Sequence, residues 1–412
     1  MTNLEYWIWF ASLRSITYRT RRALLERFGD AKGIYFAERH ELERVEGIRE
    51  EETERLTARD LDPAVSIVDR CGELDVSILT IQDAAYPERL RNIPDPPYVL
   101  YVKGHLPAVD AEPVIGFVGT RRSTPYGDKM ARNIAYAIAS KGGVITTGLA
   151  GGIDSRAAEG ALMAGGRVIG VLGVAINDVY PKWNTKLYAD VETAGALVSE
   201  YPPDAHGGGE WFPARNRIIA GLSVGVVVGE APVRSGALIT AHRALDYGRD
   251  VFVVPGNADA PACRGSNNLL REGAILAENG WDVLKEYAAR FPERIRPEGR
   301  DEIPAEQAIP EDVRKTEAQH EEKEPAAGKF LKLRVPVRKK AAPENLADQL
   351  GELSERQLRI VGVMNKPNMH IDDIIDLSAL PASAVLSELT LLQIKGFVTQ
   401  DPGKRFTLNI KK

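Results

Sequence analysis

Short apolar runs alternate with amphipathic stretches from about residue 84 to residue 291, and this is the most regular pattern in the chain. Near-continuous apolar runs of strand length are typical of strands that are buried on both faces of a parallel sheet. The stretches between them have helical spacing, which favours crossover helices on both faces. We therefore predict an α/β fold, a Rossmann-like doubly wound parallel sheet, with strands at 114–119, 143–148, 167–173, 196–201, 224–231 and 250–256.

Residues 1–80 have the spacing of short amphipathic helices and predict a small all-α domain. Residues 40–56 resemble a helix-hairpin-helix or SAM-like unit with a tight turn at Gly47. The third position of that turn is Arg49, and three glutamates follow it. Carboxylates at a helix start oppose a bound phosphate, because they already occupy the positive end of the helix dipole. We therefore expect this domain to pack or to dock a partner rather than to bind DNA.

The remaining residues predict a linker and a last domain. Residues 292–345 are rich in proline and charge, acidic first and basic afterwards, and we expect either a flexible tether or a phosphate-binding arm. Residues 346–412 predict three helices and a hairpin around a Pro-Gly pair, which is the pattern of a winged helix. The third of these helices has Lys395 as its only basic residue, so partner binding is favoured over weak duplex binding. The poor basic content of both terminal domains favours a functional centre in residues 84–291.

Composition narrows the classes of function. The net charge of −5 weighs mildly against nucleic acid, but phosphate binding depends on local positive potential, which a net figure averages away. No apolar run approaches the roughly 18 residues of a membrane span, and no signal peptide is recognisable, so we expect no membrane insertion and a cytoplasmic location. Cys71 and Cys263 are far apart and the histidines are scattered, so we expect neither a metal site nor a cofactor.

Glycine-rich turns follow several predicted strands, at the edge of a doubly wound sheet where ligands bind. Glycine lets a phosphate approach backbone N–H groups, and helix N-termini add positive potential. Arginine and lysine side chains in the same turns would add full charges. We predict a phosphate-binding edge, with the candidate residues Gly119, Thr120, Arg121, Gly148, Gly151, Lys182, Ser235 and Gly236.

A further candidate segment begins at Phe212, just before a predicted helix. An aromatic ring in this position can stack on a base, and Arg215 and Arg217 flank Asn216 immediately after it. We expect one of the two arginines to form an internal ion pair with Glu200 or Glu230 and the other to face the ligand. These four residues, Phe212, Arg215, Asn216 and Arg217, join the candidate binding residues.

The motifs of common nucleotide enzymes are missing from the chain. There is no P-loop, GTRRS stands where GxGxxG would hold a dinucleotide, and no Ser or Cys nucleophile lies in a recognisable elbow. We therefore predict a sequence-tolerant binder of single strands, not an enzyme, with no catalytic residues. The alternative is a nucleotide hydrolase or phosphoribohydrolase that uses the same phosphate cradle, with Asp154, Glu200 and Glu230 as acid–base candidates.

These residues resemble the DNA-processing protein A family, also called DprA or Smf. The resemblance extends from YPERLRNIPDPPYVLYVKG at 86–104 to SNNLLREGAIL at 266–276. Between them FVGTRRSTPYG, TTGLAGGID, FPARNRIIAGLS and EAPVRSGALITA follow in the family's order. One departure is Ala158, which stands where many members have a histidine. The helical start and the winged-helix end also resemble longer members of the family.

The resemblance implies a function in DNA uptake and recombination. It implies single-stranded DNA binding, a homodimer formed through the Rossmann-like domain, and loading of RecA recombinase onto DNA in natural transformation or homologous recombination. The family's glycine-Ser/Thr-arginine motif falls on residues 119–121, and its lysine falls on Lys182. Its arginine-asparagine-arginine motif falls on residues 215–217, and its serine-glycine helix start falls on residues 235–236.

Overall fold

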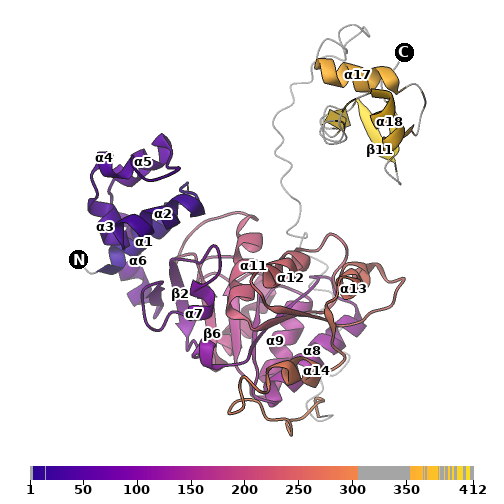
Figure 1. Cartoon of the computed structure of the whole chain (residues 1–412). Coiled ribbons are helices and arrows are strands. Elements are labelled where there is room, and N and C mark those ends of the chain that lie inside the picture. The colour runs from indigo at the N-terminus through magenta and orange to yellow at the C-terminus, as the bar shows by residue number, and fades with distance from the viewer. Residues whose placement is uncertain are drawn as a thin grey trace. The chain divides into compact units, whose positions relative to one another are not determined.

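The computed structural model describes residues 3–13, 15–304, 353–364 and most of 366–408. The chain divides into two units, Met1–Gly328 and Lys329–Lys412, and each is described by itself (Figure 1). The first unit contains the predicted helical and Rossmann-like domains, and the second contains the predicted winged helix. Of the predicted linker, residues 305–345 lie outside the described residues.

The first unit is built on a nine-stranded sheet in the order β1-β2-β6-β5-β4-β3-β7-β8-β9. The strands from β6 to β9 in this order are parallel, whereas β2 is antiparallel to β6 and β1 is antiparallel to β2. The order reverses beside β3, because the chain runs outward from β3 to β6 and then crosses back to β7. The doubly wound parallel sheet is therefore confirmed, and the six predicted strands are β3 (Val114–Val118), β4 (Val144–Thr147), β5 (Val168–Leu172), β6 (Ala196–Ser199), β7 (Gly225–Val228) and β8 (Asp250–Val253). The sequence did not predict β1 (Ser77–Thr80), β2 (Val99–Gly104) and β9 (Ile275–Leu276).

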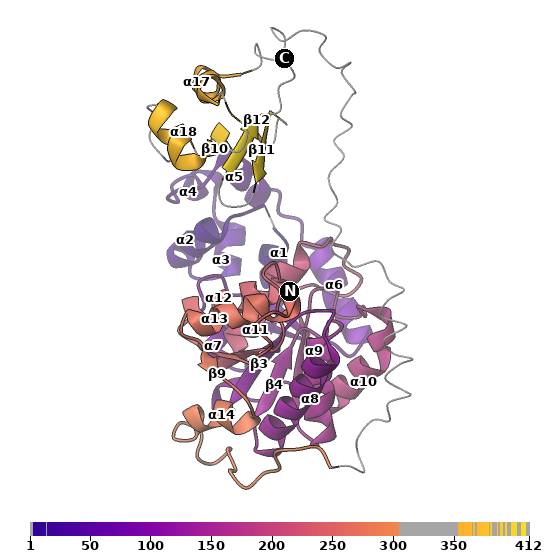
Figure 2. The same ribbon diagram turned by 90° about the vertical axis from the view of Figure 1, so that its right-hand side faces the viewer.

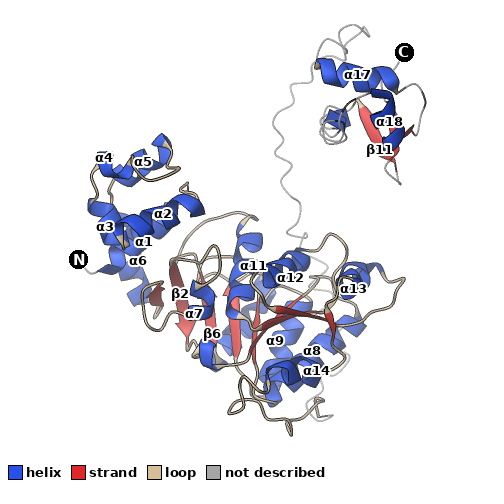
Figure 3. Ribbon diagram, in the orientation of Figure 1, coloured by secondary structure: helices blue, strands red, loops and turns tan. Residues whose placement is uncertain are grey.

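Helices cover both faces of this sheet (Figures 2 and 3). Successive residues of a strand point to opposite faces, so Ile115 and Phe117 of β3 share one core cluster with Ile134, while Val118 shares the other with Ile218. The first face is covered by α8 (Pro125–Ser140), α9 (Ile153–Met163), α10 (Thr185–Ala194) and α14 (Gly280–Leu284). The second is covered by α7 (Glu88–Arg91), α11 (Trp211–Leu222), α12 (Gly236–Asp246) and α13 (Arg264–Arg271). Single turns of 3-10 helix lie at η1 (Val109–Ala111), η2 (Lys182–Asn184), η3 (Pro261–Cys263) and η4 (Lys285–Tyr287).

Residues 292–301, which the sequence assigns to the linker, pack against the end of α8. The Nζ atom of Lys141 donates a hydrogen bond to the carbonyl of Pro297 at 2.9 Å, and the amide of Arg296 donates to the carbonyl of Lys141 at 2.9 Å. This part of the chain therefore closes the first unit at the edge of the sheet where the parallel strands begin.

The N-terminal helices pack directly on the sheet, and the prediction that residues 1–80 are all helical is wrong at its end, because Ser77–Thr80 form β1 and pair with β2. Their core contains Phe10, Leu24 and Leu56, which are fully buried. The indole of Trp7 stacks on the ring of Tyr98, which precedes β2, with a centroid distance of 6.3 Å. The core of this domain is therefore continuous with that of the sheet. The helices are α1 (Asn3–Ser12), α2 (Tyr18–Phe28), α3 (Ala31–Phe36), α4 (Arg39–Leu42), α5 (Glu50–Thr57) and α6 (Asp62–Glu73).

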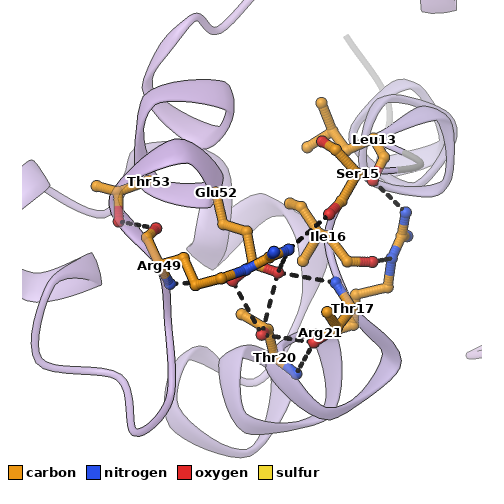
Figure 4. Close-up of polar contacts among 9 residues, drawn as sticks. All are labelled: Leu13, Ser15, Ile16, Thr17, Thr20, Arg21, Arg49, Glu52 and Thr53. Carbon is orange, nitrogen blue, oxygen red and sulfur yellow. Dashed lines mark hydrogen bonds and ion pairs between the residues drawn. The ribbon is translucent and has the colours of Figure 1, made fainter. Parts of the chain in front are cut away.

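A single buried carboxylate caps two of these helices (Figure 4). Glu52 is 1% exposed, and its side chain accepts hydrogen bonds from the backbone N–H of Thr17 at 2.9 Å and of Arg49 at 3.0 Å. Thr17 is the N-cap of α2 and Arg49 is the N-cap of α5, so the carboxylate lies at the positive ends of both helices. The anion position at the turn after Gly47 is therefore filled from within, which agrees with the expectation that this turn does not present a phosphate site.

The second unit has its own small core. A three-stranded antiparallel sheet has the order β10-β12-β11, and β11 pairs with β12 as the predicted hairpin. Ile360, Ile374 and Phe406 are buried between this sheet and the helices. Most of the predicted third helix, including Lys395, lies outside the described residues. The elements are α17 (Glu355–Val363), α18 (Ile371–Ser378), β10 (Met369–His370), β11 (Val398–Asp401) and β12 (Arg405–Leu408). Among the described helices of both units, none has the length and apolarity of a membrane span.

The substitution Glu52→Gln tests the double cap. We expect a loss of about 1–3 kcal/mol in the free energy of unfolding at neutral pH, because charge-assisted bonds to a buried carboxylate are lost. Burial by itself raises the pKa of Glu52, but the hydrogen bonds from Arg49 and Thr17 outweigh it, and the net pKa is lowered. The stabilisation is therefore present above about pH 4.3 and disappears as the pH falls through the lower folded-state pKa.

Denaturant titrations of the full chain at neutral and acid pH, followed by tryptophan fluorescence, measure this difference. Glu51→Gln is the matched control, because Glu51 is the exposed neighbour of Glu52 on the same helix. A destabilisation that is equal at both pH values would contradict the role of the charge.

Candidate nucleic-acid interface

The sequence-predicted residues gather at the edge of the sheet where the parallel strands end. The loops after β3, β4 and β5 meet there with the first turns of α11 and α12, beside the point where the strand order reverses. We call this edge the rim, and define it as residues 119–124, 148–152 and 173–184 together with the first turns of α11 and α12. Doubly wound folds bind ligands at such a reversal.

An arginine and two aromatic rings form the centre of the rim. Arg121 comes from the loop after β3, Tyr180 from the loop after β5, and Phe212 from α11. The Cζ atom of Arg121 lies 5.0 Å from the ring centroid of Phe212 and 5.8 Å from that of Tyr180, and the two rings are 5.0 Å apart. All three side chains are partly exposed. The structure therefore brings the predicted Arg121 and Phe212 together in a cation–π arrangement.

Tyr180 is absent from the candidate residues, although it lies two positions before Lys182. The sequence could have indicated Tyr180 as a candidate, because it lies close to the predicted Lys182 in the same loop. Its contact with Arg121 depends on the order of the strands, because the loops after β3 and β5 are far apart in the sequence.

Three further candidate residues lie on α11 and at the start of α12. Asn216 follows Phe212 by one helical turn, and its side-chain amide donates to the carbonyl of Gly236 at 3.2 Å. The hydroxyl of Ser235 accepts from the backbone N–H of Ala237 at 3.3 Å and caps α12. Gly236 is exposed, and a Cβ atom added there would meet nothing within 4 Å. A ligand at the rim can therefore approach the start of α12 at Gly236.

Lys182 supplies an exposed positive charge in the same loop as Tyr180. Its side chain is 71% exposed, and Nζ lies 2.6 Å from a carboxylate oxygen of Asp178. Ion pairs that are this exposed contribute little free energy, so the ammonium group can exchange the carboxylate for a phosphate at low cost.

Arg215 lies beneath the rim rather than on it. It is 4% exposed, its guanidinium lies against the backbone of Gly148, and it donates a hydrogen bond to the carbonyl of Val171 in β5. The carboxylate of Asp154 accepts from the amide of Gly148 at 3.2 Å. Burial lowers the pKa of Arg215 and raises that of Asp154, and attraction between the two opposes both shifts. The amide of the predicted Gly148 is therefore directed at an internal carboxylate. The predicted Gly151 is buried in the adjoining turn before α9.

Arg217 is the arginine that forms the expected internal ion pair. Its guanidinium lies 2.6 Å from an oxygen of Glu200 and 3.3 Å from an oxygen of Asp95, and it is 6% exposed. Burial by itself lowers the pKa of Arg217, but these two carboxylates outweigh it and the net pKa is raised. The expectation that the other arginine faces the ligand is wrong in this structure, because the guanidinium of Arg215 is buried like that of Arg217.

The start of α8 is also neutralised from within. The amide of Thr120 donates to the carbonyl of Glu230 at 2.7 Å, and Gly119 packs so closely on Ile153 that no Cβ would fit. The buried carboxylate of Glu230 accepts from the amide of Thr124, the N-cap of α8, at 2.7 Å and from its hydroxyl. Asp154, Glu200 and Glu230 are thus all engaged in internal contacts. Across the described parts of both units, no group of three or more His, Cys, Asp or Glu residues could hold a metal ion.

Comparison with known proteins decides the family. Residues 77–288 match the family model described as DNA recombination-mediator protein A, and residues 341–404 match the DprA winged helix domain. Protein Smf of a Synechocystis species is 32% identical over 417 residues, covering 98% of this chain and 99% of its own. This chain belongs to the DNA recombination-mediator protein A family. The resemblance stated from the motifs is confirmed, as is the winged helix.

A solved structure of the family agrees with the fold. DNA processing protein A from Streptococcus pneumoniae is 34% identical, with a TM-score of 0.61 over 69% of this chain and 98% of its own. The protein from Helicobacter pylori, whose structure is described as showing a single-stranded DNA binding mode, is 29% identical, with a TM-score of 0.47 over 52% of this chain and 96% of its own.

The contact between Arg215 and Gly148 can be tested by Gly148→Ala. A Cβ atom at this position would lie closer than 3.0 Å to the guanidinium of Arg215, which is itself held by Val171. We expect a loss of about 1–3 kcal/mol in the free energy of unfolding, the usual cost of overpacking a buried site. Thermal denaturation measures it, and Gly209→Ala is the control, because a Cβ at Gly209 meets nothing within 4 Å. An equal effect of both substitutions would refute the close packing.

Proposed function

We propose that this chain binds single-stranded DNA along the rim, with phosphates held by Arg121, Lys182 and the first turn of α12. The observation that carries the proposal is the guanidinium of Arg121 against the rings of Tyr180 and Phe212, in a member of a DNA recombination-mediator family. Guanidinium and ammonium groups bind phosphate by charge-assisted hydrogen bonds, and an accessible helix start adds backbone N–H donors.

The two aromatic rings favour a single strand over a duplex. A base can stack on a protein side chain only when it is not stacked inside a double helix, and such stacking tolerates every base. Contacts to phosphates carry no sequence information either. The proposed binding is therefore tolerant of sequence, and its affinity falls as salt rises.

The internal contacts of the acidic residues favour binding over hydrolysis. Glu200 is paired with Arg217, Glu230 caps α8, and Asp154 accepts from Gly148. A general acid or base must reach the reacting group, and each of these carboxylates is already engaged on the protein side. The alternative of a nucleotide hydrolase or phosphoribohydrolase is supported less well for this reason.

The proposal extends to RecA and to self-association. We propose that the bound strand is handed to RecA recombinase in the cytoplasm during transformation or recombination, and that the chain forms a homodimer through its Rossmann-like domain. The dimer is supported by β9, which stands at the end of the strand order and carries Leu276, 46% exposed. Light scattering of the full chain tests the dimer, and the rate of RecA filament growth on a single strand tests the loading.

Anisotropy of labelled oligonucleotides, single-stranded and duplex, at two salt concentrations tests the DNA site. We expect tighter binding of the single strand. The substitution Arg121→Ala should weaken binding to all single-stranded sequences and reduce the salt dependence by about 0.7 log unit of affinity per log unit of salt, the value for one phosphate contact.

The control for Arg121→Ala is Lys285→Ala, which removes the same charge at the opposite edge of the sheet. Lys285 forms a partly exposed pair with Asp282 at 3.2 Å, and α14 packs near the end of α8. The control should leave the affinity unchanged. If Arg121→Ala leaves both affinity and salt dependence at the wild-type values, the rim is not the DNA site.

The enzymatic alternative has its own experiment. Incubation of the full chain with a panel of nucleoside monophosphates, assayed for free base and free phosphate, should show no release above a protein-free control. Turnover that disappears in Glu230→Gln or Asp154→Asn would overturn the assignment as a binding protein and would favour the hydrolase.

A further inference from the structure

The loop that carries Tyr180 and the segment that leads from β6 to Phe212 on α11 are hydrogen-bonded to each other. The hydroxyl of Ser199 donates to the carbonyl of Val174 at 2.7 Å, and the amide of Ile176 donates to the carbonyl of Tyr201 at 3.2 Å. These contacts join the segment after β5, which leads to Tyr180 and Lys182, to the segment after β6, which leads to Phe212.

Asn177 and Asp204 complete this connection with a reciprocal pair of hydrogen bonds. The side-chain amide of Asn177 donates to a carboxylate oxygen of Asp204 at 2.7 Å, and the amide of Asp204 donates back to the side-chain oxygen of Asn177 at 2.9 Å. The φ of Asp204 is +58°, a left-handed conformation that aspartate tolerates better than most residues. A residue is held there only when its surroundings fix it.

Each partner of this pair is close in sequence to a residue of the rim. Asn177 is followed by Asp178, which pairs with Lys182, and by Tyr180. On the other segment, Tyr201 lies flat on the indole of Trp211, with a centroid distance of 3.6 Å and an interplanar angle of 8°, and Trp211 precedes Phe212. The Asn177–Asp204 pair is thus linked along the chain to Tyr180 and, through the stack of Tyr201 on Trp211, to Phe212.

The N-terminal domain reaches this pair through one side chain. The Nε atom of Arg70, on α6, donates to the second carboxylate oxygen of Asp204 at 2.7 Å, and its Nη1 donates to Glu73 at 2.6 Å. Hydrogen bonds from Arg70 and Asn177 lower the pKa of Asp204, so the carboxylate remains charged over the physiological range. Arg70 is separated from Asp204 by 134 positions in the sequence.

We infer that Arg70 is a positioning residue for DNA binding: through Asp204 and Asn177 it holds the loop of Tyr180 and the segment before Phe212 in the spacing that a strand requires. This inference rests on the proposed function and assigns the N-terminal helical domain a task in it. In this inference the domain acts on the rim through this contact and does not itself bind DNA. This agrees with Glu52, which occupies the N-termini of α2 and α5, where a phosphate would otherwise bind.

The experiment compares single-strand affinity in full-length variants at low salt. Arg70→Ala and Asp204→Asn should each weaken binding about two- to fivefold, as expected from the loss of a partly exposed charged contact. Asn at position 204 keeps the left-handed conformation accessible and removes only the charge. The loss in the double variant should be smaller than the sum of the two single losses, because both substitutions weaken the Arg70–Asp204 ion pair. Arg70→Lys, which keeps the charge, should restore part of the affinity.

Hydrogen exchange provides a readout that a general loss of stability would not produce. Arg70→Ala should raise exchange in segments 174–184 and 200–212 while the strands of the sheet keep their wild-type protection. The matched control is Arg22→Ala, because Arg22 forms an exposed pair with Glu26 within α2 at 2.8 Å. This control should change neither affinity nor exchange.

The outcomes separate this inference from the proposed function. If Arg121→Ala weakens binding but the Arg70 and Asp204 variants bind and exchange as the wild type does, the positioning role is overturned and the DNA site stands. Additive losses in the double variant would also overturn it, because they would show that the two residues act independently. If Arg121→Ala has no effect, the proposed function itself fails.

Discussion

The guanidinium of Arg215 is buried at the carboxyl edge of the sheet and links α11 to the ends of the neighbouring strands β4 and β5. It rests on Gly148 after β4, donates to Val171 in β5, and neighbours Asp154 at the start of α9. A buried charge is tolerated only when partners surround it. The ends of two strands and the start of a helix are therefore constrained together, and Phe212 is fixed one turn before Arg215 on the same helix.

The same constraint explains how a chain with a net charge of −5 can carry a surface for a polyanion. Carboxylates are placed inside, where Glu230 caps α8, Asp154 meets Gly148 and Glu200 neutralises Arg217. These negative charges are compensated within the fold and project little field outward. Cations that reach the surface of the rim, among them Arg121, Arg122 and Lys182, supply positive potential there.

In the N-terminal domain, too, a buried carboxylate is compensated by internal contacts. Glu52 neutralises two helix starts, so the part that resembles a nucleic-acid-binding hairpin has no accessible positive end. Its contact with the rim is instead the side chain of Arg70 on Asp204. The N-terminal helices and the Rossmann-like domain, which are separate segments of the chain, therefore meet beside the proposed DNA site.

The sequence by itself determined the elements and the edge at which the site lies. Apolar runs such as 224–231 can be satisfied only by burial on both faces, and a glycine-rich turn after such a strand must lie at the carboxyl edge of the sheet. For this reason Arg121, Phe212 and Lys182 could be predicted to gather there. The tertiary structure alone decided which charges face outward, because that depends on partners distant in the chain: Glu200 and Asp95 for Arg217, Gly148 and Val171 for Arg215, and Tyr180 for Arg121. Spacing along a strand or helix reports the face on which a side chain lies, but it carries no information on which side chain from another loop will lie opposite.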